Sequence, residues 1–141
     1  MKRFTLPALA ALGLLIGGLP ATAQTISFGD AYGRLAKSCG RDIERLCSTA
    51  QMGGNGIRAC LEKNAAKVSA DCKQTAAETF ALLGKRVQAQ TTAVQVCERD
   101  RLQYCRGVQP HDGYQLACLL KATKVVSASC KQVIVDAGWN D

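Results

Sequence analysis

The eight cysteines of this chain restrict its fold more than any other feature. They are Cys39, Cys47, Cys60, Cys72, Cys97, Cys105, Cys118 and Cys130. The second four lie 58 residues after the first four, and both sets follow the spacing C-x7-C-x12-C-x11-C. Of the 36 aligned positions that begin at Cys39, 15 are identical. Such self-similarity at a fixed period indicates a tandem duplication of one structural unit.

The N-terminal residues predict export. Two basic residues precede an apolar stretch, 6–19, and a small-residue motif that ends at Ala23. This layout is typical of a secretory signal peptide that is removed after Ala23. The apolar stretch is shorter than the roughly 20 residues that a membrane span needs, and an uncleaved N-terminal anchor is the alternative. We therefore expect a signal peptide (1–23), a first cysteine-rich repeat (24–87) and a second cysteine-rich repeat (88–141).

Composition agrees with a periplasmic or secreted protein that has no membrane span in its mature chain. An even number of cysteines behind an export signal predicts a disulfide framework in an oxidising compartment. Without residues 1–23 the chain keeps 16 Lys and Arg against 11 Asp and Glu. This excess favours an anionic partner, such as an acidic envelope macromolecule or protein, although the charges could simply solvate helix surfaces. Nucleic acid is not expected, because the aromatic residues are too scattered to form a stacking platform.

Apolar residues at steps of three and four predict helices in the first repeat. One such stripe runs from Phe28 to Leu46, where Ser27 or Asp30 can cap the helix, and a glycine-rich segment, 52–56, ends it. A second helix is expected over 57–68. Ser69 is then a suitable cap for a third helix, which carries Cys72, Phe80 and Leu83. No stretch alternates as a strand does, so the predicted fold class is all-α, with two tandem disulfide-stapled helical-hairpin repeats.

The second repeat is expected to begin with a new helix. Gly84 weakens the helical pattern, and the spacing of Thr92 and Gln95 suits a capping box. The segment 110–113 takes the place of the glycine-rich turn. The last helix is expected to end near Ala137.

Helix geometry restricts the cysteine pairing. Cys39 and Cys47 on one helix would lie about 12 Å apart, whereas a disulfide tolerates a Cα separation of at most about 7 Å. A hairpin brings Cys47 to Cys60 across the turn, and the outer cysteines, Cys39 and Cys72, then meet. The two arms differ in length, and a kink at 68–69 could absorb the difference. By the repeat, we expect the further pairs Cys105–Cys118 and Cys97–Cys130.

The pattern resembles the cysteine-rich repeat of the Golgi cysteine-rich fibroblast growth factor receptor and of similar bacterial chains with a signal peptide. The C-x2-D-x4-C start, the Cys-Leu of the second helix and the Ser-x2-Cys of the third carry the resemblance. The matching residues are Cys39, Asp42, Cys47, Cys60, Leu61, Ser69 and Cys72, then Cys97, Asp100, Cys105, Cys118, Leu119, Ser127 and Cys130. The resemblance implies an extracytoplasmic helical repeat and, for the animal members, protein and growth-factor binding. It implies no catalytic residues.

Thiol and metal chemistry fit the cysteine pattern poorly. A thiol oxidoreductase needs a C-x-x-C pair, zinc sites usually show close cysteine pairs or mixed Cys/His sets, and helical copper storage would need cysteines at i and i+4. The sequence has none of these. We therefore expect no metal site and no cofactor, and we keep a thiol-based metal-binding or redox protein of the periplasm as the alternative function.

Hydrolytic chemistry would have to involve His111, the single histidine, which lies in a turn. A surface histidine is the simpler interpretation. The recurring Asp42 and Asp100 could in principle act as acids or bases, but a helix salt bridge or a hydrogen bond to the neighbouring hairpin explains them more simply. We therefore expect no catalytic residue and no enzymatic activity.

The sequence favours a non-enzymatic, exported structural or protein/glycan-binding module of the cell envelope. In this hypothesis the disulfides stabilise a rigid, basic surface. Its expected contacts with an anionic partner are Arg41, Arg45, Lys63, Lys67, Arg99 and Lys121.

Overall fold

A computed structural model of the protein describes residues 22–51, 55–109 and 113–140. Within these ranges the chain forms six α-helices and no strand, which confirms the predicted all-α fold class. The helices are α1 (Phe28–Leu46), α2 (Gly56–Lys63), α3 (Ala70–Val96), α4 (Glu98–Tyr104), α5 (Tyr114–Lys121) and α6 (Ala128–Ala137). Most of the predicted signal peptide and the turn that holds His111 lie outside the described residues.

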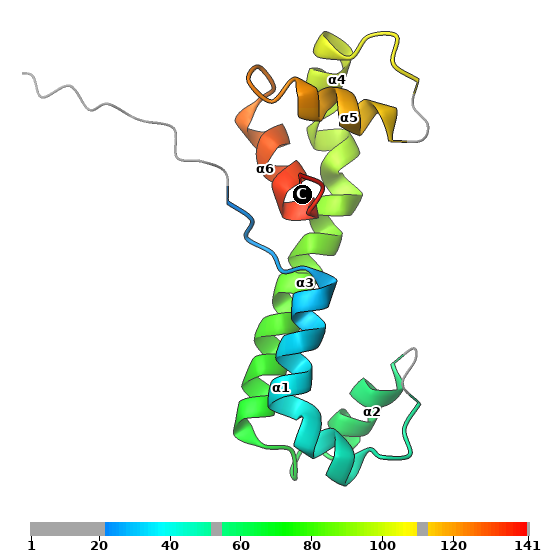
Figure 1. Ribbon diagram of the computed structural model, residues 1–141, viewed down its shortest axis with the longest axis vertical. Coiled ribbons are helices and arrows are strands. Elements are labelled where there is room, and N and C mark those ends of the chain that lie inside the picture. The colour runs from blue at the N-terminus through cyan, green and yellow to red at the C-terminus, as the bar shows by residue number, and fades with distance from the viewer. Residues whose placement is uncertain (1–21, 52–54, 110–112, 141) are drawn as a thin grey trace, which may run out of the picture.

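The longest helix, α3, forms the axis of an elongated molecule (Figure 1). Its first half packs antiparallel against α1, with α2 alongside at one end, and its second half packs against α6. Helices α4 and α5 lie at the opposite end of the molecule. The N-terminal segment, 22–27, passes beside α6 at the middle of the molecule, which we call the waist.

Serine side chains fix where three of the helices begin. Ser27, Ser69 and Ser127 each precede the first residue of a helix and accept a hydrogen bond from the backbone N–H three residues later, at 3.0–3.2 Å. This arrangement satisfies one of the N–H groups that have no partner within the helix. The predicted caps at Ser27 and Ser69 are confirmed.

Two predicted helix boundaries are wrong. The second helix ends at Lys63 rather than at Val68, and the segment 64–67 forms turns. This change of direction buries the Val68 side chain and positions Ser69 to cap α3. The chain therefore reverses between the second and third helices, instead of kinking within one arm of a hairpin.

No new helix begins at Thr92. Helix α3 continues through Gly84 and Thr92 to Val96, and the Thr92 hydroxyl donates to the Gln88 carbonyl within the same helix. Packing of this part of α3 against α6 outweighs the small helix-breaking tendency of one glycine. The residue 87/88 border proposed from the sequence therefore falls inside α3, and both units use this helix.

The core is divided between the two ends. Near α2 it consists of Cys39, Val68 and Cys72. The core near α5 is larger, and its buried members are Cys97, Cys105, Leu119, Val126, Cys130 and Ile134. Half-cystines form a large part of both clusters, so the disulfides contribute packing as well as covalent restraint.

Candidate functional site

Four disulfides connect the helices of the two units. The bonds are Cys39–Cys72, Cys47–Cys60, Cys97–Cys130 and Cys105–Cys118. The pairs separated by 33 residues have Cα atoms 4.7–4.8 Å apart, and the pairs separated by 13 residues have Cα atoms 5.9–6.0 Å apart. The predicted nested pairing is therefore confirmed in both units. The outer bond of the first unit joins α1 to α3, and its inner bond ties the end of α1 to α2.

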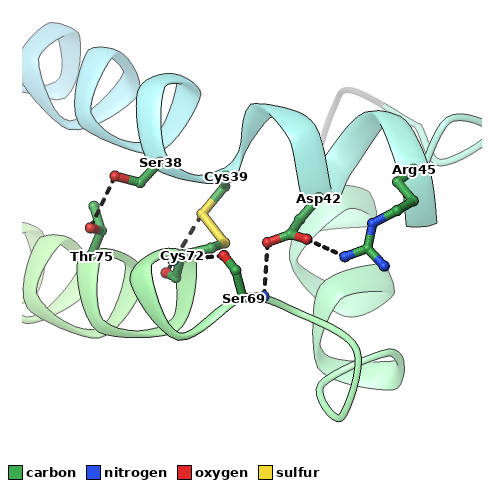
Figure 2. The surroundings of a disulfide bond; sticks show 7 residues. All are labelled: Ser38, Cys39, Asp42, Arg45, Ser69, Cys72 and Thr75. Atoms are coloured by element: carbon green, nitrogen blue, oxygen red, sulfur yellow. Dashed lines mark hydrogen bonds and ion pairs between the residues drawn. A yellow bond between two sulfur atoms is a disulfide. The ribbon is translucent and has the colours of Figure 1, made fainter.

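A buried aspartate lies beside each outer disulfide. In Figure 2, Asp42 on α1 points towards Ser69 at the start of α3, and its carboxylate accepts a hydrogen bond of 2.9 Å from the Ser69 backbone N–H. In the second unit Asp100 accepts from the backbone N–H of Ser127 at 2.8 Å and from its hydroxyl at 2.7 Å. Of the two explanations that the sequence offered, the helix salt bridge occurs at Asp42, which pairs with Arg45. The hydrogen bonds that both aspartates accept come from a serine of the same unit and not from a neighbouring hairpin. We call these pairs the Asp–Ser links.

The electrostatics of Asp42 favour its charged form. The neighbouring Ser69 hydroxyl, the Ser69 backbone N–H and the Arg45 guanidinium together lower the pKa of Asp42 from 3.8 to about 2. The Arg45 guanidinium pairs with this carboxylate and also donates to the Lys67 carbonyl at 2.9 Å. A carboxylate held ionised in this way stabilises the fold and is poorly suited to general acid catalysis near neutral pH.

The basic residues that the sequence suggested as partner contacts do not form one surface. All six are exposed. Arg41, Arg45, Lys63 and Lys67 lie at the end of the molecule that holds α2, whereas Arg99 and Lys121 lie on α4 and α5 at the opposite end. Arg45 is in addition engaged by Asp42 and Lys67. The elongated shape therefore separates residues that the alignment of the two repeats had grouped together.

Three other cations come together at the waist. Arg34 and Lys37 on α1 and Arg86 on α3 line an open cleft of about 690 Å³. Residues of the N-terminal segment and of the C-terminal end of α6 form the rest of its lining. The carboxylate in this cleft is Asp30, which accepts a hydrogen bond of 2.7 Å from the Ser27 hydroxyl. The cleft therefore has an excess of positive charge and suits a carboxylate, sulfate or phosphate group.

Arg86 is the most enclosed of the three cations. Its guanidinium lies 5.9 Å from the centre of the Phe28 ring and makes long contacts of 3.4 and 3.5 Å with the carbonyls of Ile26 and Gly138. Its Nε is buried and has no hydrogen-bond partner among the described residues. Gly138 has a φ of +71°, and a Cβ at this position would overlap the guanidinium. The glycine that ends α6 thus leaves the space that Arg86 occupies.

The N-terminal segment joins the two units at the waist. The backbone N of Gln24 donates to the Asp136 carboxylate at 2.7 Å, and the Thr25 hydroxyl donates to the Asp136 carbonyl at 2.7 Å. Gln132 donates from its side chain to the Thr22 carbonyl at 3.0 Å. The Ile26 side chain is buried. Residues that precede α1 therefore contact α6, more than 100 positions later in the sequence.

Sequence reasoning missed the waist cleft for a physical reason. Arg86 lies midway along α3, in the region where a helix break was predicted, and nothing in the sequence indicates that the end of α6 returns to it. The spacing of Arg34 and Lys37 does place them on one face of α1. That spacing is common on solvated helix faces, so it could not distinguish a site from an ordinary surface.

Comparisons with protein-family models, curated proteins and solved structures gave no match. In the described ranges, no helix combines the length and apolar character that a bilayer-spanning segment needs. Nor do three or more His, Cys, Asp or Glu side chains in this part of the chain gather as metal ligands would. The function is therefore inferred from the geometry of the site.

Proposed function

We propose that this chain is an exported, non-enzymatic cysteine-rich repeat protein of the cell envelope that binds an anionic macromolecule, an acidic glycan or an acidic protein. The observation that carries the proposal is the convergence of Arg34, Lys37 and Arg86 around the waist cleft. Guanidinium and ammonium groups donate charge-assisted hydrogen bonds to carboxylates and sulfates, and these are stronger than neutral ones. The proposed function is therefore recognition of negatively charged groups.

The disulfides support an extracytoplasmic location. Four of them in a chain of 141 residues suit an oxidising compartment, such as the periplasm or the cell exterior. Cleavage after Ala23 would create a new amino group at Gln24, whose nitrogen lies 2.7 Å from the Asp136 carboxylate. A positive amino group at this position would form an ion pair. Processing would therefore remove the hydrogen bond between Gln132 and the Thr22 carbonyl, and the ion pair between Gln24 and Asp136 would hold the new N-terminus to α6.

Covalent restraint also suits a binding role. A surface that is already ordered loses less conformational entropy when a partner binds. The waist cleft takes its cations from α1 and α3, and the Cys39–Cys72 bond connects these two helices. The alternative, thiolate metal binding or redox chemistry, would need reduced cysteines, whereas all eight are paired in disulfides.

A charge-matched pair of variants tests the proposal. The sulfated glycan heparin serves as the anionic probe, and binding to the oxidised mature protein is measured by surface plasmon resonance at several salt concentrations. The double variant Arg34→Ser, Lys37→Ser removes two cations of the cleft. We expect it to weaken binding by at least about tenfold, since each charge-assisted hydrogen bond contributes about 1.5–3 kcal/mol. The control double variant Lys121→Ser, Lys124→Ser removes the same charge from exposed positions on and after α5.

The control determines how the result is interpreted. We expect the control to change affinity less than about threefold, as loss of diffuse surface charge does. Equal losses in both double variants would mean that the whole surface attracts the probe and that the waist cleft has no special role. No binding by the oxidised protein would remove the support for sulfated glycans and leave acidic proteins to be tested in the same way.

A further inference from the structure

The first unit contains a second cavity, between α1, α2 and α3. Its volume is about 450 Å³, within the range of about 300–1,000 Å³ that small-molecule sites have. The Cys39–Cys72 disulfide borders it, and apolar side chains from all three helices line it, among them Ile43, Leu61 and Ala76. This cavity is separate from the waist cleft, with which it shares no lining residue.

The second unit has aliphatic side chains at three of the equivalent positions. Three residues around the cavity have aliphatic counterparts 58 positions later: Ala76 corresponds to the larger Ile134, and the charged Arg58 and Glu62 correspond to Leu116 and Leu120. Ile134 is 4% exposed, and both leucines pack against its cluster. The small Ala76 side chain therefore leaves space beside the cavity that a branched aliphatic side chain takes in the second unit. An alkyl chain has the chemistry to fill it.

The rim of the cavity favours a negative charge. Arg58 on α2 pairs with Glu62 at 2.8 Å, and its guanidinium lies 5.3 Å from the centre of the Phe80 ring on α3. Lys73, also on the rim, forms no ion pair within the described residues. The rim thus carries two cations and one carboxylate, and that carboxylate is already paired with Arg58. Both members of the Arg58–Phe80 contact are exposed, and such surface contacts are weak enough to open for a ligand.

We propose that this cavity binds a free single-chain fatty acid, with the alkyl chain between α1, α2 and α3 and the carboxylate at Lys73 and Arg58. The aliphatic side chains at the equivalent positions of the second unit, and the apolar lining of the cavity itself, argue for the alkyl chain. The cationic rim argues for the carboxylate. The inference does not depend on the binding of anionic macromolecules at the waist, because the two sites use different residues.

Nuclear magnetic resonance of the ¹⁵N-labelled, oxidised mature protein tests the site with sodium decanoate as the probe. We expect shifts of the amide signals of Ile43, Leu61 and Ala76, and none at Leu119 or Ile134. Each added methylene that is buried should tighten binding about fourfold, so octanoate, decanoate and dodecanoate should differ by about 15-fold per step until the cavity is full. Decyltrimethylammonium, which has the same tail and a positive head, should bind at least about tenfold more weakly than decanoate.

Two variants test the tail and the head separately. Ala76→Ile introduces the side chain that the second unit has at this position, and it should reduce decanoate affinity at least about tenfold while leaving the helical circular dichroism unchanged. Lys73→Ser should remove most of the preference for decanoate over decyltrimethylammonium. The matched control is Lys131→Ser, at the equivalent position of the second unit, and it should leave decanoate binding unchanged.

Several results would overturn the proposal. These are no localised shifts with decanoate, equal affinity for the positively charged amphiphile, or unchanged binding in a folded Ala76→Ile protein. If Ala76→Ile does not fold, an unchanged head-group preference in Lys73→Ser overturns it instead. Shifts of the same amide signals with protein concentration alone would show that a second copy of the chain covers the cavity, which would also contradict a fatty-acid site.

Discussion

At the scale of single residues, the Asp–Ser links explain why each unit needs an aspartate three residues after its first cysteine. Asp42 and Asp100 are both buried. Each accepts a backbone hydrogen bond from a capping serine, which is Ser69 at the start of α3 for Asp42 and Ser127 at the start of α6 for Asp100. The serine hydroxyl in turn accepts from the backbone N–H of the cysteine in the outer disulfide. One polar link therefore fixes where the helix begins and how the outer cysteines face each other.

We predict that Asp42 makes the stability of the protein depend on acid pH. Its pKa is lowered from 3.8 to about 2, so the folded state favours the ionised carboxylate more than the unfolded state does. The resulting stabilisation is complete above about pH 4–5 and is lost as the pH falls towards about 2. The free energies of unfolding of the wild type and of Asp42→Asn, measured with urea, should therefore differ most near neutral pH and least at about pH 2.

The control for this comparison is Glu44→Gln, which removes an exposed carboxylate from the same helix. Its effect on the urea midpoint should be small across the same pH range. A difference between the wild type and Asp42→Asn that stays constant down to about pH 2 would show that the carboxylate is not held ionised in the folded protein.

At the scale of helices, α3 is the element that joins the two units. The first unit uses its N-terminal part through Cys72, and the second uses its C-terminal part, which leads through Cys97 into α4. Because one helix serves both units, their relative orientation depends on the straightness and stability of α3 near Gly84. A flexible linker between the units would leave the waist cleft without a fixed shape.

We predict that Gly84→Ala stabilises the protein by about 0.5–1 kcal/mol, because alanine in a helix interior loses less backbone entropy on folding than glycine. Gly84 is exposed, and a Cβ at this position would meet no atom within 4 Å. The contrasting variant is Gly138→Ala, which should destabilise the fold because of the positive φ and the overlap with Arg86. Urea unfolding of both variants checks this, and a destabilised Gly84→Ala would contradict an intact α3.

Helix positions could be predicted from the sequence where local patterns determine them. They could not be predicted where tertiary packing determines them. The stripe from Phe28 to Leu46 and the Ser69 cap were predicted correctly, because helical periodicity and capping are local. The new helix expected at Thr92 was wrong, because contacts of α3 with α6 outweigh the weakening of the helical pattern at Gly84. The disulfide pairing was predictable because helix rise and sulfur geometry leave few possibilities.

The candidate sites were harder to predict. The waist cleft combines α1, α3 and the end of α6, which are brought together only by the folded chain. The apolar cavity had a visible signal, since Ala76 in the first repeat aligns with Ile134 in the second. A smaller side chain in one of two duplicated units can leave a cavity in that unit. The alignment alone does not show which residues border such a cavity.

At the scale of the whole molecule, covalent bonds replace part of the hydrophobic core. The buried cluster of the first unit contains only Val68 besides two half-cystines. In the chain-entropy model, each inner disulfide contributes about 3 kcal/mol and each outer one somewhat under about 4, and nested bonds are not fully additive. Small domains are stable by only about 5–15 kcal/mol. The four bonds together are therefore comparable to the whole stability of the fold.

We predict that reduction unfolds the mature protein. Excess reductant at neutral pH should abolish most of the helical circular dichroism signal, and the first unit, which has the smaller core, should unfold first. The control is the same treatment without reductant. A reduced protein that keeps its full helical signal would show that packing alone is sufficient for the fold.

The most direct measurement is mass-spectrometric mapping of the cysteine linkages in the non-reduced protein isolated from its native compartment. We expect four linked peptide pairs, Cys39–Cys72, Cys47–Cys60, Cys97–Cys130 and Cys105–Cys118, and no free thiol. Linkages between the two halves, or reduced cysteines that hold a metal ion, would contradict the disulfide-stapled helical architecture on which both proposed binding sites depend.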